Sequence, residues 1–255
     1  IGVVSFLPDD AAMIRGGPEQ RRKGLDRFAY SLFPGFAAIA KRLDDALERR
    51  NRVLKAPVVD EELLESYDAP FCDAAAALTK ARAHAASKWA PAFAAEARAV
   101  GGDALDAVMQ YAPAIDEDAG DEPALSARLA ELLGAARASE LKRRTTSTGP
   151  QQDDVVFLKG DRRARFLASQ GEARALVLAM KLAAVRLASE ARGTGPLLLL
   201  DDVAGELDPD KAARLFRAVD ETGAQVFVTT THAHALPAVG DSATFRVEAG
   251  RVERV

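Results

Sequence analysis

The chain has 255 residues and a formal net charge of −4, with 48% hydrophobic and 28% charged residues. This length allows one large or two modest domains with a real core, and the balance of residue types is that of a globular protein. The longest apolar runs are far below membrane-spanning length, so we expect no membrane partner. The negative net charge gives no global indication of nucleic-acid binding, so any such indication must be local.

Cys72 is the single cysteine of the sequence. One cysteine excludes an internal disulfide framework and permits a reducing compartment, so we expect a cytoplasmic protein. The sequence starts at Ile1 rather than methionine, and its first six residues look like the middle of a strand. These two features lead us to expect a fragment or a processed product.

The first half of the chain is predicted to be mainly helical. Apolar residues recur there at helical spacing, and glycines and prolines mark the breaks between segments. In chain order we expect a strand at 2–6 and helices at about 10–15, at 18–55 with an interruption at 33–35, at 60–101 with a break near Pro70, and at 123–141. No strand pattern is visible between about 18 and 148, so this stretch is predicted to form an α-helical arm.

Strands and helices alternate in the second half of the chain. We expect a strand at 155–158 that continues as a hairpin through 165–167, a helix at 169–191, a strand at 197–201, a helix at 209–221, a strand at 225–230, and a final hairpin of 243–248 and 251–255. The order strand, helix, strand, helix, strand is typical of a parallel sheet. The fold class is therefore predicted to be α/β, a mostly parallel sheet with helices, plus a helical arm.

Two aspartates end the leucine-rich strand of the second half. The run 197–200 is apolar on both faces, which fits a parallel sheet covered on both sides. Open α/β sheets bind ligands beyond the carboxyl ends of their strands. There Asp201 is a candidate Mg²⁺ ligand, and Asp202 could polarise an attacking water in phosphoryl transfer. The alternative is a core strand followed by acidic capping residues.

Ser169, Gln170 and Gly171 stand directly before the long helix of the second half. A helix N-terminus offers free N–H groups and a positive dipole end, and glycine allows a ligand to approach closely. With the serine hydroxyl, these features favour a bound phosphate. The alternative is an ordinary serine N-cap.

Two more polar residues flank the later elements. Asp208 lies before Pro209 and a helix, where a helix cap is the simplest interpretation. His232 follows three threonines at the end of the last parallel strand, and it could contact a terminal phosphate or be an ordinary surface histidine. His234 lies two residues further on, but no cysteine or acidic residue is spaced to complete a metal site with this pair.

The order of these motifs resembles the ATPase head of the RecF family, bacterial recombinational repair proteins of the ABC type that are related to SMC heads. Residues 165–174 (RFLASQGEAR) are similar to its signature motif, and 198–208 to its Walker B motif and D-loop. The resemblance extends to 149–154 (GPQQDD) and spans nearly the whole chain. It implies three regions: the end of an N-terminal ATPase lobe with a Q-loop-like segment at 1–14, an α-helical arm subdomain at 15–148, and a C-terminal ATPase lobe at 149–255.

The resemblance also implies ATP and Mg²⁺ as cofactors. Ser169, Gln170 and Gly171 would contact the γ-phosphate of ATP held by the other subunit. Asp201 would bind Mg²⁺, and Asp202 would take the position of the catalytic carboxylate.

The remaining matched positions come with departures from the family pattern. Asp208 would belong to the D-loop at the dimer interface, and either Thr231 or His232 would be the switch residue. The stretch 151–152 is Gln-Gln where the family has His-Arg, so no role is carried over to that pair. No Gly-x-x-x-x-Gly-Lys-Ser/Thr occurs in the 255 residues, so the phosphate-binding loop of the N-terminal lobe is expected to be missing and the chain alone to be inactive.

Local clusters of basic residues are candidates for DNA binding. The stretch 15–55 holds eleven Lys or Arg against five acidic residues, and the stretch 142–165 adds seven further Lys or Arg. Such clusters can neutralise backbone phosphates without reading sequence, although a solvated helix face is the alternative. The candidate residues are Arg49, Arg50, Arg52, Arg143 and Arg144.

The family resemblance implies a recombinational DNA repair ATPase. ATP would join two heads into a homodimer that binds single-stranded or gapped DNA, and the protein would support recombinase loading by mediator proteins, replication and the SOS response. One alternative is another SMC-like or ABC-type DNA repair ATPase. A second alternative, from a different class, is a DNA-binding or scaffold module that needs no nucleotide.

Overall fold

The computed structural model describes residues 2–115, 120–202, 209–231 and 242–255. In chain order its elements are β1 (Val3–Phe6), η1 (Pro8–Ala11), α1 (Ala12–Arg15), α2 (Pro18–Leu32), α3 (Phe36–Leu54), α4 (Glu61–Ser66), α5 (Asp68–Gly101), η2 (Gly102–Leu105), β2 (Ala107–Ala112), α6 (Glu122–Arg143), η4 (Pro150–Gln152), β3 (Asp154–Lys159), β4 (Arg162–Arg163), α7 (Ala164–Leu167), α8 (Gln170–Arg192), β5 (Leu197–Asp201), α9 (Pro209–Asp220), β6 (Val226–Thr229), β7 (Phe245–Glu248) and β8 (Arg251–Arg254).

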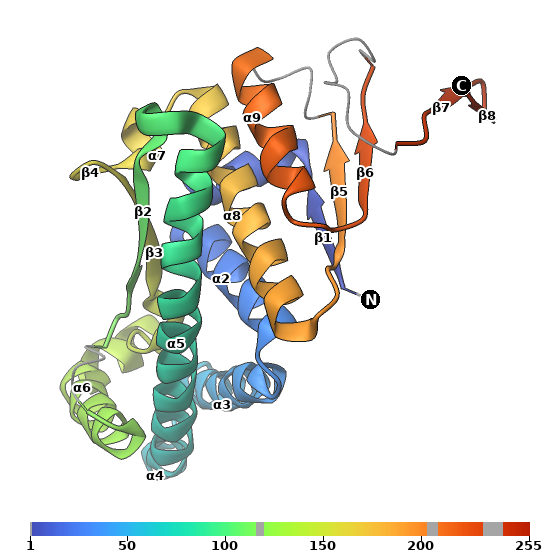
Figure 1. Cartoon of the computed structure of the whole chain (residues 1–255). Helices are drawn as coiled ribbons and strands as arrows, with labels where there is room; N and C mark the ends of the chain where they lie inside the picture. The colour runs from blue at the N-terminus through green and yellow to red at the C-terminus, as the bar shows by residue number, and fades with distance from the viewer. Residues whose placement is uncertain (1, 116–119, 203–208, 232–241) are drawn as a thin grey trace.

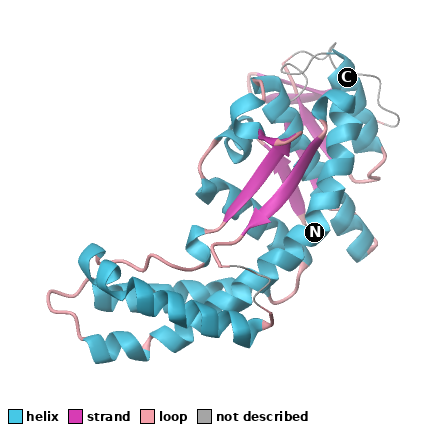
Figure 2. Ribbon diagram, turned by 90° about the vertical axis from the view of Figure 1, so that its left-hand side faces the viewer, coloured by secondary structure: helices cyan, strands magenta, loops and turns pink. Residues whose placement is uncertain are grey.

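The helix α5 forms the axis of the molecule. Its 34 residues are rich in alanine, and their small side chains let other elements pack closely around it. Figures 1 and 2 show α3, α4 and α6 around the first half of α5, where they form the arm, and the sheets and α8 around the second half. The ring of Trp89 on α5 stacks on Phe28 of α2 at 4.4 Å between centroids, within the main core.

The parallel sheet has the strand order β1-β5-β6, which confirms the predicted α/β class. Leu198 and Leu200 of β5 are buried on the side where α8 and α9 pack (Figure 1). The opposite face corrects the expectation of a sheet covered on both sides. There Val3, Leu199 and Phe227 keep 56%, 36% and 53% of their surface exposed.

A second sheet, with the order β2-β3-β4, is antiparallel and corrects the prediction of an entirely helical stretch from 18 to 148. The strand β2 interrupts that stretch and pairs along its whole length with β3, from Ala107 opposite Lys159 to Ala112 opposite Asp154. Ala107 and Met109 are buried while Val108 is exposed, which is the alternation of a half-buried strand. The boundaries at 14/15 and 148/149 stay a prediction.

Two local expectations are also wrong. The segment 165–167 is not a strand, because the chain turns after β4 into the short helix α7. The expected break near Pro70 lies instead at Tyr67, between α4 and α5. Pro70 fits the first turn of α5, where an N–H group has no intrahelical partner to lose. The described helices include none that is long and apolar enough to cross a membrane.

Candidate functional site

The carboxyl ends of β5 and β6 bring Asp201 and Thr229 together. The two residues are register partners in the parallel pair, and the Thr229 hydroxyl donates a hydrogen bond of 2.5 Å to Asp201 Oδ1. The backbone N–H of Asp202 donates to the carbonyl and the hydroxyl of Thr229. The predicted acidic end of β5 is thus held by Thr229, for which no role was predicted. The position of Thr229 at the end of the neighbouring strand could have identified it as a site residue.

Asp202 has a backbone φ of +48°, in the left-handed region. Aspartate tolerates this region better than most side chains, whereas a β-branched residue there would be strained. One oxygen of Asp202, Oδ1, is buried and accepts no hydrogen bond within the described part of the chain. Such an unsatisfied buried acceptor is costly unless another group supplies a donor. The Asp202 side chain therefore keeps one oxygen without a hydrogen-bond donor among the described residues.

Ser169 is the N-cap of α8, as the simpler interpretation of the sequence predicted. Its hydroxyl accepts a hydrogen bond from the N–H of Glu172, and the Glu172 carboxylate accepts one from the N–H of Ser169, which completes a capping box. Lys159 of β3 also binds the Glu172 carboxylate. The hydrogen bond from Lys159 and that from the Ser169 backbone lower the pKa of Glu172.

No packing contact among the described residues requires a glycine at position 171. A Cβ atom built on it would meet no described heavy atom within 4 Å. Ser169 and Gln170 are exposed, and so is the preceding Phe166, which keeps 70% of its surface. The start of α8 is therefore an open surface with room for a ligand or a second molecule. Figure 1 shows it at the same end of the molecule as the carboxyl ends of β5 and β6.

Two predicted site residues, Asp208 and His232, lie outside the described residues. Thr231 is described and is the second residue after the end of β6 at Thr229. The structure therefore brings together Asp201, Asp202 and the threonine end of β6. The exposed turn at Ser169 belongs to another surface at the same end.

The predicted DNA-binding residues divide into exposed and buried ones. Arg49, Arg52, Arg143 and Arg144 are exposed on the arm. Arg50 is a correction, because its side chain is 0% exposed and cannot reach DNA from the folded arm. It donates to three groups, namely Asp68 Oδ1 at 2.9 Å, Glu140 Oε2 at 2.7 Å and Thr146 Oγ1 at 2.7 Å.

A second buried network joins the arm to the antiparallel sheet. Arg82 of α5 forms a double hydrogen bond with Asp26 of α2, at 2.8 and 2.9 Å, and donates to Asp153 Oδ2 at 2.8 Å. Asp153 is 0% exposed and also accepts hydrogen bonds from the Tyr111 hydroxyl and the Ala114 N–H. The sequence motif at 149–154 thus contains a structural anchor. No role was predicted for Asp153 because the donors to its carboxylate lie between 39 and 71 residues away.

Comparison with known proteins identifies the family. No model of a known protein family matches the chain. Two curated relatives are both named "DNA replication and repair protein RecF". The one from Myxococcus xanthus is 42% identical over 91% of this chain, which spans 62% of the relative. The one from Symbiobacterium thermophilum is 38% identical over 99% of this chain and 68% of the relative.

The chain belongs to the RecF family. It is a RecF-type DNA repair and replication protein, as the order of its motifs predicted. A solved structure described as "recombination mediator protein RecF-ATP in RecFOR pathway" has a TM-score of 0.83 at 25% identity, covering 99% of this chain and 67% of that one.

The RecF-type fold also has a more distant neighbour. A Pyrococcus furiosus Smc head domain, solved with the C-terminal domain of ScpA, has a TM-score of 0.51 at 13% identity and covers 99% of this chain. At that identity the likeness concerns the fold alone. It agrees with the predicted ABC-type head.

Proposed function

We propose that this RecF-type chain supplies the Walker B carboxylates to the ATP site of its own subunit and the signature turn to the ATP site of a second subunit. The observation that carries the proposal is the pairing of Asp201 with Thr229 at the carboxyl edge of the parallel sheet, beside the left-handed turn at Asp202. In open α/β folds this edge is where ligands bind. Binding of ATP is further supported by the RecF-ATP structure to which the chain is similar.

The residues present fit a bound Mg²⁺ ion. Mg²⁺ in nucleotide sites takes one or two carboxylates, and water and phosphate oxygens fill its other positions. Asp201 at the end of β5 supplies one such carboxylate. The ion would offset the charge of the phosphates. The carboxylate of Asp202 would polarise the attacking water.

The signature turn is proposed to act on ATP held by the partner subunit. Ser169 and Gly171 stand at an exposed helix N-terminus, which favours an anion, and Gly171 leaves room for close approach. The Ser169 hydroxyl accepts from the Glu172 N–H and also lies within hydrogen-bond reach of the Glu172 carboxylate, and it would turn its proton toward a phosphate oxygen when ATP binds. Asp208 and either Thr231 or His232 keep their proposed places in the D-loop and the switch.

DNA is the proposed macromolecular ligand, and the arm is the proposed contact surface. Arg49, Arg52, Arg143 and Arg144 are exposed there and would bind backbone phosphates without reading sequence. Single-stranded or gapped DNA, mediator proteins that load recombinase, a role in the SOS response and a cytoplasmic location complete the proposal. The DNA repair name of the relatives and the RecFOR pathway named for a solved structure support the DNA and mediator parts of this proposal.

The ATP site is tested by three variants of the full-length protein. Ser169→Arg should abolish ATP-dependent dimerisation in analytical ultracentrifugation, because a long cation fills the open turn. Ser169→Asn keeps a good N-cap and should retain the fold while it weakens dimerisation. Asp202→Asn tolerates the left-handed backbone and should lower ATP hydrolysis about 100-fold or more. Unchanged dimerisation of Ser169→Arg would remove Ser169 from the interface.

A further inference from the structure

The peptide group that leads into the signature turn is held at both of its polar ends. The carbonyl of Ala168 accepts a hydrogen bond from Arg15 Nη2 at 2.8 Å. The N–H of Ser169 donates to Glu172 Oε2, also at 2.8 Å. A peptide group is planar, so two hydrogen bonds at its opposite edges fix its orientation. They therefore fix the backbone plane from which the Ser169 side chain projects.

The two partners of this peptide group have different origins. Glu172 lies three residues after Ser169, and these two residues complete the capping box by themselves. Arg15 lies 153 residues before Ala168, in α1, which packs against α7 and α8. Arg15 is exposed, so its hydrogen bond to Ala168 should contribute little to the stability of the fold. The bond from Arg15 is thus a constraint on the turn that helix capping does not require.

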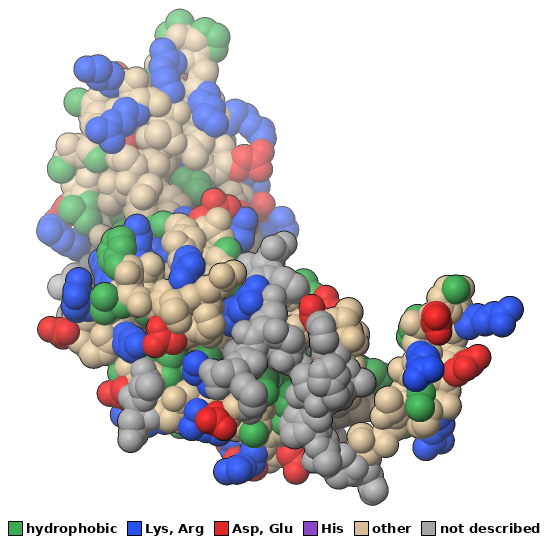
Figure 3. Space-filling view, turned by 90° about the horizontal axis from the view of Figure 1, so that it is seen from above, with side chains coloured by type: hydrophobic (Ala, Val, Ile, Leu, Met, Phe, Trp, Pro, Cys, Tyr) green, Lys and Arg blue, Asp and Glu red, His purple; other side chains and the backbone are tan. Residues whose placement is uncertain are grey.

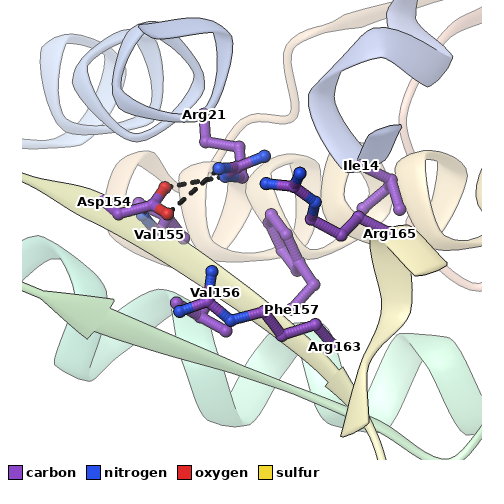
Figure 4. Close-up of a pocket in the computed structure, with 8 residues that line it drawn as sticks. All are labelled: Ile14, Arg21, Asp154, Val155, Val156, Phe157, Arg163 and Arg165. Atoms are coloured by element: carbon purple, nitrogen blue, oxygen red, sulfur yellow. Dashed lines mark hydrogen bonds and ion pairs between the residues drawn. The ribbon is translucent and has the colours of Figure 1, made fainter. Parts of the chain in front are cut away.

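The backbone on both sides of Arg15 is anchored. Ile14 before it is 1% exposed and lines the small cavity drawn in Figure 4. The carbonyl of Gly16 after it accepts a hydrogen bond from Arg21 Nη1 at 2.6 Å. Figure 4 also shows the double hydrogen bond that Arg21 donates to Asp154 of β3, with lengths of 2.7 and 3.0 Å. The guanidinium of Arg15 is therefore presented to Ala168 from a fixed backbone.

We propose that Arg15 is a positioning residue for the signature turn. It acts through the Ala168–Ser169 peptide group, which it holds in the orientation that directs the Ser169 hydroxyl toward the γ-phosphate of ATP on the other subunit. Such a donor is effective only when it is held within about 0.5 Å of the productive geometry. The inference rests on the proposed role of Ser169 and adds a residue outside the signature stretch 165–174.

The first test separates dimerisation from ATP binding in the full-length protein. Arg15→Met keeps an aliphatic side chain without the donors, so it should weaken ATP-dependent dimerisation at least about tenfold in analytical ultracentrifugation. ATP binding by the monomer should be unchanged, because the signature turn acts on the nucleotide of the other subunit. Fluorescence anisotropy of a labelled ATP analogue, at a protein concentration too low for dimers, measures this binding. Arg15→Lys keeps a donor and should restore part of the dimerisation.

Arg22→Met is the matched control. Arg22 also donates to a main-chain carbonyl, that of Asp153 at 2.6 Å, but outside the signature turn. This variant should dimerise as the wild type does, and the melting temperature of Arg15→Met should fall by no more than about 3 °C. Equal losses of dimerisation for Arg15→Met and Arg22→Met would overturn the proposal, as would wild-type dimerisation of Arg15→Met. A parallel loss of ATP binding by the Arg15→Met monomer would show a purely structural role and overturn it too.

A double variant tests whether Arg15 acts through Ser169. Ser169→Asn keeps a good N-cap and removes the hydroxyl. Adding Arg15→Met to Ser169→Asn should therefore weaken dimerisation clearly less than Arg15→Met does in the wild type, because residues that act as a unit are not additive. Additive losses would contradict the proposal.

Ser169→Arg separates this inference from the proposed function on which it rests. If Ser169→Arg abolishes dimerisation while Arg15→Met has no effect, only the role of Arg15 is wrong. If Ser169→Arg dimerises normally, the proposed role of Ser169 fails and that of Arg15 fails with it.

Discussion

At the scale of single residues, Arg50 and Arg52 show that neighbours on one helix can have opposite roles. Arg50 is buried among Asp68, Glu140 and Thr146. Arg52 pairs with Glu48, four residues before it, and both side chains remain more than 70% exposed. A buried charge that loses its partner is costly, whereas an exposed helical pair contributes little.

We therefore expect Arg50→Ala to lower the free energy of unfolding by about 3–5 kcal/mol, because it leaves Glu140 buried without its cation. Arg52→Ala should cost less than about 1 kcal/mol. Urea denaturation followed by circular dichroism measures both. Equal losses for the two variants would contradict the account. The DNA affinity should show the reverse pattern, since only Arg52 is placed to reach a phosphate.

Cys72 is a second residue whose chemistry follows from its burial. Its side chain is 1% exposed, and burial raises the pKa of the thiol to about 12. Because the thiolate is the reactive form, we expect Cys72 to resist alkylation by iodoacetamide at pH 8 in the native protein. The same reaction should be fast in denaturant. Rapid modification without denaturant would show that α5 opens near its N-terminal end.

At the scale of elements, the start of α8 combines a stabilising cap with a proposed functional turn. Lys159 first, and then the Ser169 backbone, lower the pKa of Glu172 in the folded chain. The folded state therefore favours the carboxylate. This stabilisation is fully present above the ordinary glutamate pKa of about 4.3 and is lost as pH falls through the lower folded pKa.

The expected result is a steeper loss of stability on acidification below about pH 4.3 in the wild type than in Glu172→Gln. Glutamine can still close the capping box, so the variant isolates the charge. Lys159→Met should flatten the same part of the curve, because it removes the main cause of the shift. Urea midpoints between pH 3 and pH 6 provide the measurement. Parallel curves for Glu172→Gln and the wild type would exclude this contribution.

At the scale of the whole molecule, stability is concentrated around α5 and falls toward the C-terminal hairpin. The core joins α2, α5, α8 and the parallel sheet, and the Arg82 network links α2 and α5 to Asp153 just before β3. The hairpin of β7 and β8 is a separate two-stranded sheet, and all eight of its residues are exposed. Figure 3 shows it standing apart from the body of the molecule.

An isolated hairpin of this kind is marginally stable in water. Amides of 245–254 should therefore exchange with deuterium within seconds, while those of α5 and β5 should exchange only through global unfolding. Hydrogen exchange followed by mass spectrometry resolves the two classes. Strong protection of the hairpin in the purified chain would mean that another surface covers its apolar face, which holds Phe245, Val247 and Val252.

Much of the element order could be predicted because it depends on contacts within a few residues. The predicted serine, Ser169, is the N-cap of α8, and Gly193 is its C-cap, where a φ of +70° suits glycine. The parallel strands and the acidic end of β5 also follow from local apolar runs. The strand β2 could not be assigned in this way. Its short, alanine-flanked pattern is weak, and it is stabilised by pairing with β3 more than 40 residues later.

The sequence by itself determined the family, most of the order of the elements, and the places of Asp201 and Asp202 at a strand end and of Ser169 at a helix start, because motifs and caps are encoded locally. Only the tertiary structure decided which charges are buried. Arg50 lies at helical spacing between Leu47 and Leu54, but its burial depends on Glu140, 90 residues away. The tertiary structure also gave Asp201 its partner Thr229 and placed Arg15 at the carbonyl of Ala168. Charge pairing depends on the distance between side chains in space, which spacing along the chain does not specify.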